Sequence, residues 1–315
     1  MRLNIDAPLV VIVGPTAVGK TILSIELARR LSGEILSADS RLFYKGMDMG
    51  TAKPTLQARQ EIPHHLIDIV LLDENFSLPL FQQKAYALID QIHSWGNLPF
   101  LVGGTGQYIW AVVEGWKPPV VIPNNRMRTA LFTWGSVIGA EELHRRLGIL
   151  DPEAADKIQP KNLRRTIRAL EVILSTGKLF SSQRRKQAPP YTIKIIGLER
   201  PREELYRRID NRIDAMIKSG LVEEVEQLLA SGFTANLPTM SAIGYQEIAL
   251  FLGGQISLDD AVILMKRRTR KFVRHQSNWF KKTDSRIKWF NMKENAVDLV
   301  EEYIRSSRGW QNPKK

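Results

Sequence analysis

Short apolar runs and amphipathic stretches alternate along the chain. Residues 9–13 (LVVIV) are continuously apolar and rich in branched side chains, which is typical of a buried parallel strand. Apolar residues at helical spacing predict helices at 21–31 and 78–95. Further strands are predicted at 34–38, 98–102, 192–198 and 287–290, with an extended piece at 65–70. Strands that alternate with helices favour right-handed βαβ units, so the sequence predicts an α/β fold with a parallel sheet flanked by helices.

A different pattern occupies residues 117–190. This segment opens with KPPVVIP, closes with KQAPPY, and between them shows helical periodicity without a convincing strand. Proline-rich boundaries around a helical block are typical of an inserted subdomain. We therefore expect two domains, a core formed by residues 1–116 and 191–315 and a helical insert formed by residues 117–190.

The pattern after Pro201 is mainly helical. Two amphipathic stretches lie between residues 202 and 229, a third helix is predicted at 245–252, and a long one is predicted from 258 to about 282. The last strand, at 287–290, is followed by a predicted helix at 296–306.

The amino-acid composition indicates the kind of cellular compartment in which the protein acts. The 315 residues include no cysteine, which excludes disulfides and thiolate zinc sites and makes a reducing, cytoplasmic compartment the natural expectation. No apolar run approaches the roughly 20 residues that cross a bilayer. The first residues also lack the long hydrophobic segment of an export signal. We expect neither a membrane partner nor secretion.

The net charge of +12 is concentrated in the later part of the chain. Residues 1–100 hold 9 Lys and Arg against 10 Asp and Glu. Residues 157–186 hold nine basic residues and one acid, and residues 261–290 hold ten basic residues and one acid. Clusters this one-sided indicate a polyanionic partner such as nucleic acid, or otherwise a solvated helix face.

One motif indicates specific chemistry. Residues 14–21 read GPTAVGKT, which satisfies G-x-x-x-x-G-K-[ST] between a predicted strand and a predicted helix. In such a P-loop, backbone N–H groups and the positive end of the helix hold phosphate oxygens, the lysine reaches them, and the hydroxyl of Thr21 can ligate Mg²⁺. A diphosphate fits this loop as well as a nucleotide does. The predicted phosphate-binding residues are Gly14, Pro15, Thr16, Ala17, Val18, Gly19, Lys20 and Thr21.

The acidic residues of the chain do not fit simple nucleotide hydrolysis. Asp68 and Asp90 are poorly placed to hold Mg²⁺ at the end of a hydrophobic strand, and the strand at 98–102 ends in GGT without an acid. Asp39 follows the predicted strand at 34–38, and the carboxyl ends of parallel strands meet at one crevice. There Asp39 could accept a proton from an incoming nucleophile, a role worth roughly 10²–10⁴ in rate. It could equally be a turn or helix-capping residue.

Six further motifs follow the P-loop along the chain. They are SADSRLFYKGMDMGTAKP at 37–54, IPHHLIDI at 62–69, VGGTGQYI at 102–109, NLRRTIRALEV at 162–172, IGYQE at 243–247 and TRKFVRHQSNWFKK at 269–282. Together with GPTAVGKT they resemble the tRNA dimethylallyltransferase family, also called tRNA isopentenyltransferases, from about residue 9 to 282. The resemblance implies transfer of a dimethylallyl group from its diphosphate to N6 of adenosine 37, beside the anticodon, in tRNAs that read codons beginning with U. The P-loop would then hold the diphosphate of the donor.

The resemblance also implies roles for individual catalytic residues. Lys20, with Mg²⁺ as cofactor, would neutralise charge on the leaving diphosphate. Asp39 matches the family's catalytic aspartate, which takes the N6 proton, and Thr105 matches a threonine that contacts the substrate. An arginine of an R-x-x-x-R helix supports the diphosphate in the family. Arg208 and Arg212 both fit that pattern here, and we favour Arg212.

The tRNA contacts implied by the resemblance lie in several separate segments. They are Asp39, Ser40, Arg41, Leu42, Thr105, Arg128, Arg164, Arg165, Arg168, Gly244, Tyr245, Arg274 and Gln276. The chain departs from the family pattern at Leu42 and Arg164, where a glutamine is expected, and at residues 273–276, where the family's A-K-R-Q reads V-R-H-Q. We expect the change at Leu42 to affect base selection and not the diphosphate chemistry. The expected partners are a tRNA anticodon stem-loop and dimethylallyl diphosphate, and the protein is expected to be a monomer.

Other functions share a P-loop. Prenylation of free adenylate would not need two basic windows or a helical insert, and phosphoryl transfer by a P-loop kinase is a second enzymatic alternative. A non-catalytic RNA-binding protein is the third. The joint presence of Lys20, Thr21, Asp39 and Thr105 argues against that last alternative.

Overall fold

The structure is a computed structural model that describes residues 7–119, 121–183 and 185–306. The first six residues, which were read as carrying no export signal, lie outside the described residues, as does Arg184 of the first basic window. The chain divides into two compact units. Met1–Val113 with Pro189–Lys315 is called the core unit below, and Glu114–Ala188 is called the insert unit. The insert was expected at residues 117–190.

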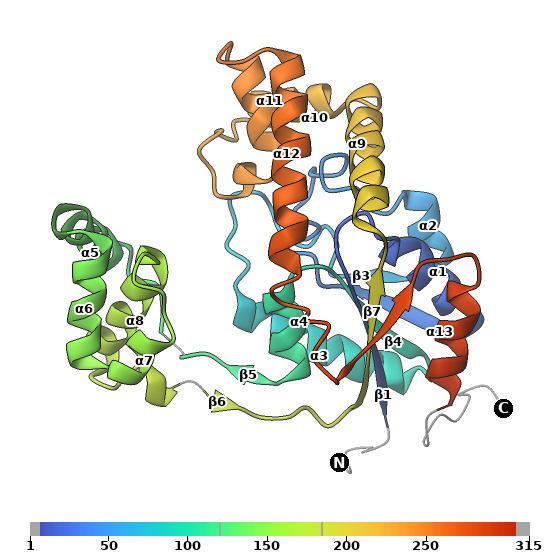
Figure 1. Ribbon diagram of the computed structural model, residues 1–315, viewed down its shortest axis with the longest axis horizontal. Coiled ribbons are helices and arrows are strands. Elements are labelled where there is room, and N and C mark those ends of the chain that lie inside the picture. The colour runs from blue at the N-terminus through green and yellow to red at the C-terminus, as the bar shows by residue number, and fades with distance from the viewer. Residues whose placement is uncertain (1–6, 120, 184, 307–315) are drawn as a thin grey trace. The chain divides into compact units, whose positions relative to one another are not determined.

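A parallel sheet forms the centre of the core unit (Figure 1). Its spatial order is β3-β2-β4-β1-β7-β8, and every neighbouring pair runs parallel. Val11 of β1 lies between Leu101 of β4 and Ile195 of β7. The strands are β1 (Pro8–Val13), β2 (Gly33–Ser37), β3 (His64–His65), β4 (Leu98–Val102), β7 (Thr192–Glu199) and β8 (Ile287–Asn291). The predicted α/β fold is confirmed.

Helices make up most of the remaining regular structure. In the core unit they are α1 (Lys20–Arg30), α2 (Leu56–Glu61), α3 (Leu78–Ser94), α4 (Gly106–Val113), α9 (Arg202–Lys218), α10 (Leu221–Ala230), α11 (Tyr245–Leu252), α12 (Leu258–Gln276) and α13 (Ala296–Arg305). A short 3₁₀ turn, η2 (Thr239–Ser241), precedes α11.

Helices cover both faces of the sheet. Val10 and Ile12 of β1 share one apolar core with Leu23 and Leu27 of α1, because alternate strand residues point to the same face. Helix α13 lies beside α1 on that face, and α3 and α4 lie on the other (Figure 1). Two covered faces explain why the central strands are continuously apolar.

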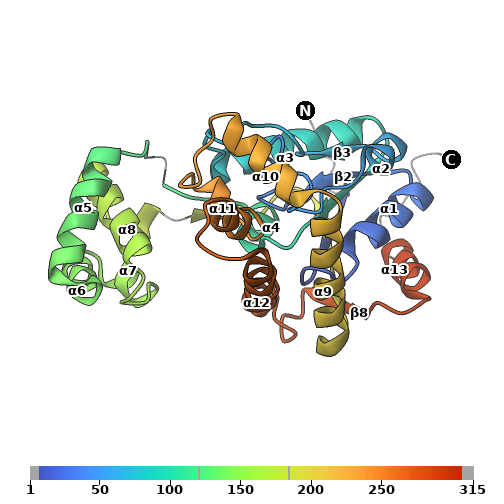
Figure 2. The ribbon, with the colours of Figure 1, turned by 90° about the horizontal axis from the view of Figure 1, so that it is seen from above.

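Helices α9 to α12 lie beyond the carboxyl ends of the strands (Figures 1 and 2). Two ion pairs join the neighbouring helices α9 and α12. Lys266 lies 2.6 Å from Asp214, and Arg270 pairs with Asp210 one turn further along. These helices therefore cover the edge of the sheet at which the P-loop begins.

Helix α12 is shorter than the sequence predicts. It ends at Gln276 and not near residue 282. The backbone tightens into turns there, since the N–H groups of Trp279 and Phe280 both donate to the carbonyl of Gln276. Trp110 Nε1 also donates to the carbonyl of Trp279 at 2.9 Å, which anchors the chain outside the helix.

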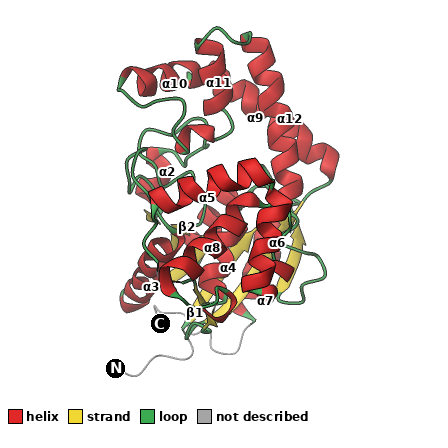
Figure 3. Cartoon of the chain, turned by 90° about the vertical axis from the view of Figure 1, so that its left-hand side faces the viewer, coloured by secondary structure: helices red, strands yellow, loops and turns green. Residues whose placement is uncertain are grey.

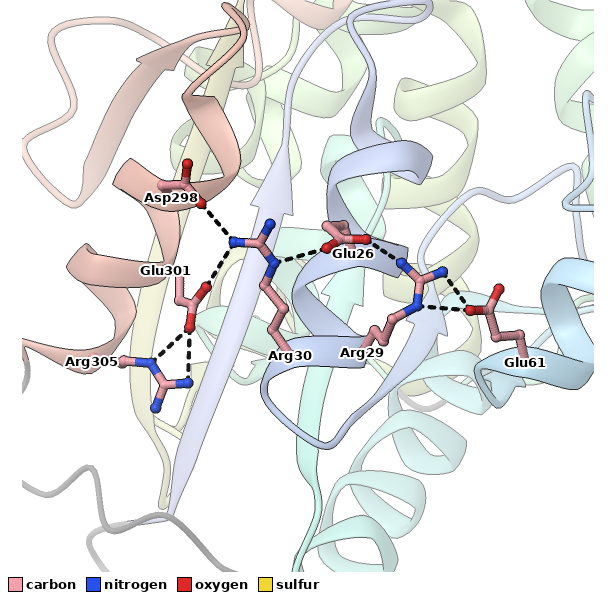
Figure 4. Close-up of polar contacts among 7 residues, drawn as sticks. All are labelled: Glu26, Arg29, Arg30, Glu61, Asp298, Glu301 and Arg305. Atoms are coloured by element: carbon pink, nitrogen blue, oxygen red, sulfur yellow. Dashed lines mark hydrogen bonds and ion pairs between the residues drawn. The ribbon is translucent and has the colours of Figure 1, made fainter.

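A chain of ion pairs ties α2 and α13 to α1 (Figure 4). Arg30 of α1 contacts Asp298 at 2.6 Å and Glu301 at 3.2 Å, both on α13. The adjacent Arg29 pairs with Glu61 of α2. Exposed ion pairs contribute little to stability, so these contacts chiefly orient helices that apolar packing holds in place.

The insert unit is helical (Figure 3). Its helices are α5 (Asn125–Ile138), α6 (Ala140–Leu150), α7 (Pro152–Asp156) and α8 (Leu163–Thr176), with a 3₁₀ turn η1 (Ser181–Gln183) and an antiparallel pair of short strands, β5 (Trp116–Lys117) and β6 (Arg185–Lys186). Leu131, Leu143, Leu147 and Leu170 belong to a core of its own. Among the described residues of the whole chain, no helix is long and apolar enough to cross a membrane.

Candidate active site

The P-loop connects β1 to α1 at the carboxyl edge of the sheet. Gly14 has a φ of +148°, and a Cβ atom there would lie 2.7 Å from the carbonyl oxygen of Leu198, so only glycine fits. Gly19, with a φ of 115°, immediately precedes the first turn of α1. The loop therefore opens onto the amino end of a helix, where free N–H groups and the helix dipole favour an anion.

Lys20 is held within this loop. Its Nζ donates to the carbonyl oxygens of Gly14 and Pro15, both at 2.9 Å. Burial lowers the pKa of Lys20 from 10.5 to about 8, against the opposing effect of the Asp39 carboxylate and with a further lowering by Arg212. Lys20, Asp39 and Arg212 are thus close enough to influence one another, and a bound phosphate would restore the charge of the lysine.

Asp39 and Thr105 follow the paired strands β2 and β4 and line the same cavity. The N–H of Ser40 donates to Thr105 Oγ1 at 3.3 Å, which joins the two segments. Asp39 Oδ1 accepts the N–H of Arg41 at 3.1 Å. Asp39 therefore closes a local turn and also faces the cavity, so the turn-forming and proton-accepting roles are compatible.

Two arginines hold the P-loop backbone and a third lines the cavity. Arg208 Nε donates to the carbonyl of Ala17 at 2.8 Å, and Arg200 Nε donates to that of Val18 at 2.9 Å. Arg212, one turn after Arg208 on α9, lines the cavity instead. Burial lowers the pKa of Arg212, and Asp39 opposes that effect. Of the two candidates for a diphosphate contact, the structure places only Arg212 in the cavity wall.

Gln276, the last residue of α12, is bound to the P-loop. Its Oε1 accepts the N–H of Thr16 at 2.8 Å, and its Nε2 donates to the carbonyl of Gly104 at 3.2 Å. The side chain is buried. In this structure it links three segments of the active site, and its expected contact with tRNA stays a prediction. No local sequence pattern marks this contact.

These residues surround a cavity of about 590 Å³ in the core unit. Its polar wall includes Thr16, Asp39, Thr105, Arg212 and Gln276. Its apolar wall includes Ile209, Ile213 and Met216 of α9, Met265 and Phe272 of α12, and Trp279. Polar groups that suit phosphate and apolar groups that suit hydrocarbon line one space, whose volume is within the range of small-molecule sites.

Two residues of the IGYQE motif, Gly244 and Tyr245, do not line the cavity. Gly244 and Tyr245 are buried, and the Tyr245 hydroxyl donates to Glu224 at 2.6 Å. Both were expected to contact tRNA, but in this structure any effect of theirs on RNA is indirect. The missed residue is Glu247, a buried carboxylate that accepts the N–H of Gly244 at 2.8 Å and pairs with Arg268 on the cavity wall.

The other expected tRNA residues of the core unit differ in accessibility. Ser40 and Arg41 line the cavity, and Arg41 Nη1 donates to the carbonyl of Thr239 at 3.1 Å. Leu42 is half-buried, and its N–H closes a turn onto Asp39. Arg274 is exposed on the last turn of α12. Exposure of Arg274 is compatible with a phosphate contact.

The arginines expected in the insert unit fall into two groups. Arg128 binds both carboxylate oxygens of the buried Glu171, at 2.9 and 3.0 Å, and Arg168 lies 2.7 Å from the same carboxylate. Glu171 is the single acid of the first basic window, and it is neutralised by Arg168 of that window together with Arg128 from outside it. Arg164 and Arg165 are exposed on α8, where they can meet a polyanion.

Among the described residues, no three His, Asp or Glu side chains gather into a metal site. Thr21 lies exposed in the first turn of α1. Mg²⁺ usually keeps several waters and binds through one or two protein groups together with substrate phosphates. The Thr21 hydroxyl suits such a site, and Mg²⁺ stays a prediction.

Comparisons with known proteins agree with this geometry. Residues 42–283 match the family model described as IPP transferase. The chain is 49% identical over 303 residues to a protein of Roseiflexus sp. named tRNA dimethylallyltransferase, covering 96% of this chain and 98% of that protein. It is 46% identical over 290 residues to a protein of the same name from Thermomicrobium roseum, covering 92% and 88%.

Solved structures show the same similarity. A tRNA isopentenylpyrophosphate transferase from Bacillus halodurans superposes with a TM-score of 0.71 at 40% identity, covering 95% of both chains. A eukaryotic dimethylallyltransferase acting on tRNA gives a TM-score of 0.79 at 26% identity, covering 96% of this chain and 81% of that one.

Proposed function

The chain belongs to the IPP transferase family, and on this premise we propose that it is a tRNA dimethylallyltransferase. It transfers a dimethylallyl group from dimethylallyl diphosphate to tRNA. The acceptor is N6 of adenosine 37 in tRNAs that read codons beginning with U, and the product is N6-dimethylallyladenosine. One observation carries this proposal: Thr16 of the P-loop, Asp39, Thr105 and Arg212 line a single cavity to which α9 and α12 also contribute apolar side chains.

The polar side chains of the cavity must stabilise the diphosphate as it leaves. The lone pair of N6 forms a bond to C1 of the dimethylallyl group while the bond from C1 to the diphosphate oxygen breaks, and the diphosphate leaves with the bonding electrons. Thr16 of the P-loop and Arg212 line the cavity, and Lys20 is held within the same loop, so we propose that the negative charge develops beside these groups. Preorganised donors of this kind stabilise a transition state without reorganising. Mg²⁺, held by the Thr21 hydroxyl and the diphosphate, would supply further neutralisation.

Asp39 accepts the proton. An exocyclic adenine amine becomes acidic only as its new bond forms, so a carboxylate beside it speeds the reaction by removing that proton. The turn that binds Asp39 Oδ1 to the N–H of Arg41 fixes the carboxyl group at the cavity wall. Thr105, joined to Ser40, is placed to orient the acceptor base beside it.

The base must leave its stack before it can react. Extrusion of a nucleotide costs a few kcal/mol, which contacts to the RNA backbone and to the flipped base offset. Exposed Arg164, Arg165 and Arg274 are the phosphate contacts we propose, and Arg41 and Arg268 lie on the cavity wall where the base would enter. This division separates positioning of the RNA from recognition of the base.

We also propose that the enzyme is cytoplasmic and monomeric. A cytoplasmic enzyme agrees with the absence of cysteine and with an RNA substrate. The monomeric state is a prediction that sedimentation of the purified protein would test.

A transfer assay distinguishes the candidate functions. The protein is mixed with Mg²⁺ and labelled dimethylallyl diphosphate, and the acceptor is either an anticodon stem-loop that carries adenosines 36 and 37 or free AMP. We expect label only in the stem-loop, at N6 of adenosine 37. Label in AMP alone would indicate an adenylate prenyltransferase, and phosphate transfer from ATP in place of prenyl transfer would indicate a kinase.

A further inference from the structure

Two cavities meet at helix α9. The active-site cavity lies on one side, and a smaller cavity of about 360 Å³ lies next to it. Among the described residues, two that line the smaller cavity also line the larger one, Arg212 and Met216. They therefore form the partition between the two spaces.

We propose that Met216 limits the prenyl donor to five carbons by closing the end of the donor site. This inference rests on the proposed function, because it concerns the hydrocarbon part of the same donor. It assigns to the methionine a specificity role that the diphosphate contacts cannot supply, since diphosphates of all prenyl chain lengths carry the same charged group.

The helix sets the distance between the two ends of the donor. Arg212 and Met216 are four residues apart, so they project from one face of α9 with their Cβ atoms about 5–6 Å apart. Arg212 lies beside Lys20 and Asp39, at the diphosphate end. Ile213 lies between Arg212 and Met216 in the sequence of α9 and also lines the cavity, so a short prenyl chain that starts at Arg212 and follows Ile213 would reach Met216 within about one helical turn.

Methionine is suited to such a wall. Its unbranched side chain fills irregular gaps, and Met216 is half-buried with its apolar surface against the main core. A well-packed wall rejects extra methylene groups because overpacking forces side chains out of their preferred rotamers.

Space for a longer chain exists behind the wall. The smaller cavity has apolar lining from Met49, Ala52 and Leu56 and charged lining from Asp48, Lys53 and Arg59. Its volume lies within the range of small-molecule sites. Removal of the Met216 side chain beyond Cβ would take away its share of the partition and leave Arg212 in place. A second isoprene unit could then pass along α9 into the smaller cavity.

Met216→Ala tests this inference with two donors, dimethylallyl diphosphate and the ten-carbon geranyl diphosphate, and an anticodon stem-loop as acceptor. We expect kcat/KM with geranyl diphosphate to rise roughly tenfold or more, the size of effect that one or two methylene groups have in a hydrophobic pocket. Activity with the five-carbon donor should stay within a few-fold of wild type. Met216→Val removes less of the side chain and should give a smaller rise in kcat/KM with geranyl diphosphate. It replaces Met216→Ala in the experiment if the alanine variant unfolds.

Two control variants test whether the effect is specific to the Met216 side chain. Met216→Leu keeps the volume of the side chain and should keep five-carbon selectivity. Met49→Ala enlarges only the smaller cavity and should leave geranyl transfer unchanged, because Met49 does not line the active-site cavity.

Failure of the proposed function and failure of the role of Met216 give different experimental results. If the wild-type protein transfers no dimethylallyl group to RNA, the proposed function fails. If it transfers that group but Met216→Ala and Met216→Val, both folded, gain no activity with geranyl diphosphate, the role of Met216 is refuted. Equal use of both donors by the wild-type protein would refute it as well.

Discussion

Gln276 and Thr16 lie 260 positions apart, and a hydrogen bond of 2.8 Å joins the Gln276 side-chain oxygen to the Thr16 backbone N–H. A P-loop N–H is a donor that phosphate oxygens use, so the amide oxygen of Gln276 occupies a place suited to the substrate. Because Gln276 ends α12, the contact connects the donor site to the helix that bears much of the second basic window.

Gln276→Glu should weaken donor binding. A carboxylate at this position would bind the Thr16 N–H more strongly than an amide does and would also repel the diphosphate. We expect the KM for dimethylallyl diphosphate to rise roughly tenfold or more, as loss or gain of a charged hydrogen bond commonly gives. Steady-state kinetics with saturating stem-loop measures this, and an unchanged KM would show that the substrate does not approach Thr16.

Asp39→Asn should remove most activity while RNA binding persists. The amide keeps the shape of the carboxyl group and can still accept the N–H of Arg41, but it cannot take the N6 proton. We expect kcat to fall by roughly 10²–10⁴, the contribution of a general base. Stem-loop affinity, measured by fluorescence anisotropy, should change little. A parallel loss of affinity would mean that Asp39 positions the RNA and that another group is the base.

The pH dependence of donor use should reflect Lys20. In the free enzyme its pKa is lowered to about 8, and the charged form binds diphosphate. Below that pH the lysine is protonated, so kcat/KM for the donor should be level there and then fall about tenfold per pH unit above it.

Lys20→Arg is the matched control for this profile. Arginine stays protonated throughout the range, so this variant should be less active but show no inflection near the pKa of Lys20. A wild-type profile that stays level from pH 7 to about 9.5 would show that the charge of Lys20 is not needed for donor binding.

Arg212→Ala and Arg208→Ala should affect different properties. Arg212 lines the cavity, so its loss should raise the donor KM roughly tenfold to a hundredfold, as expected for a hydrogen bond to a charged group, with little change in Tm. Arg208 binds the carbonyl of Ala17, so its loss should lower the stability of the loop by about 0.5–1.5 kcal/mol. Donor titrations and thermal unfolding of both variants measure this. The reverse pattern would assign the diphosphate contact to Arg208.

Arg165→Ala and Arg128→Ala make a similar pair in the insert unit. Exposed Arg165 should contribute to RNA affinity, and its loss should reduce the salt dependence by about one phosphate contact. Arg128 is bound to buried Glu171, so its loss should cost about 1.5–3 kcal/mol of stability. Salt titrations of stem-loop binding and thermal unfolding distinguish them. An Arg128→Ala protein of unchanged Tm but weakened RNA binding would contradict this assignment.

The sequence predicts those parts of the protein that depend on local pattern. The P-loop between β1 and α1 is visible because its glycines and Lys20 lie at fixed positions within eight consecutive residues, 14–21. The meeting of Asp39 and Thr105 follows from the rule that parallel strands end at one edge of a sheet. Such features need only the order of elements along the chain.

Contacts between distant side chains could not be predicted in this way. The basic windows are evident in the sequence, but the pairing of Arg128 and Arg168 with one buried glutamate is not. Tyr245 was expected at the RNA surface, yet its ring packs where Gly50 leaves room and is fully buried. Charge and motif identify which residues matter, whereas packing decides which of them face the substrate.

The central claim is that the P-loop holds a leaving diphosphate while Asp39 lies beside the amine that attacks C1 of the prenyl group. The position of the two phosphorus atoms in a crystal of this protein with the unreactive thio analogue of dimethylallyl diphosphate tests it most directly. We predict both phosphates within hydrogen-bonding distance of the residue 14–21 amides and Lys20, with the prenyl chain along α9 and C1 turned toward Asp39. Diphosphate bound away from the P-loop, or a prenyl chain remote from Asp39, would contradict the account.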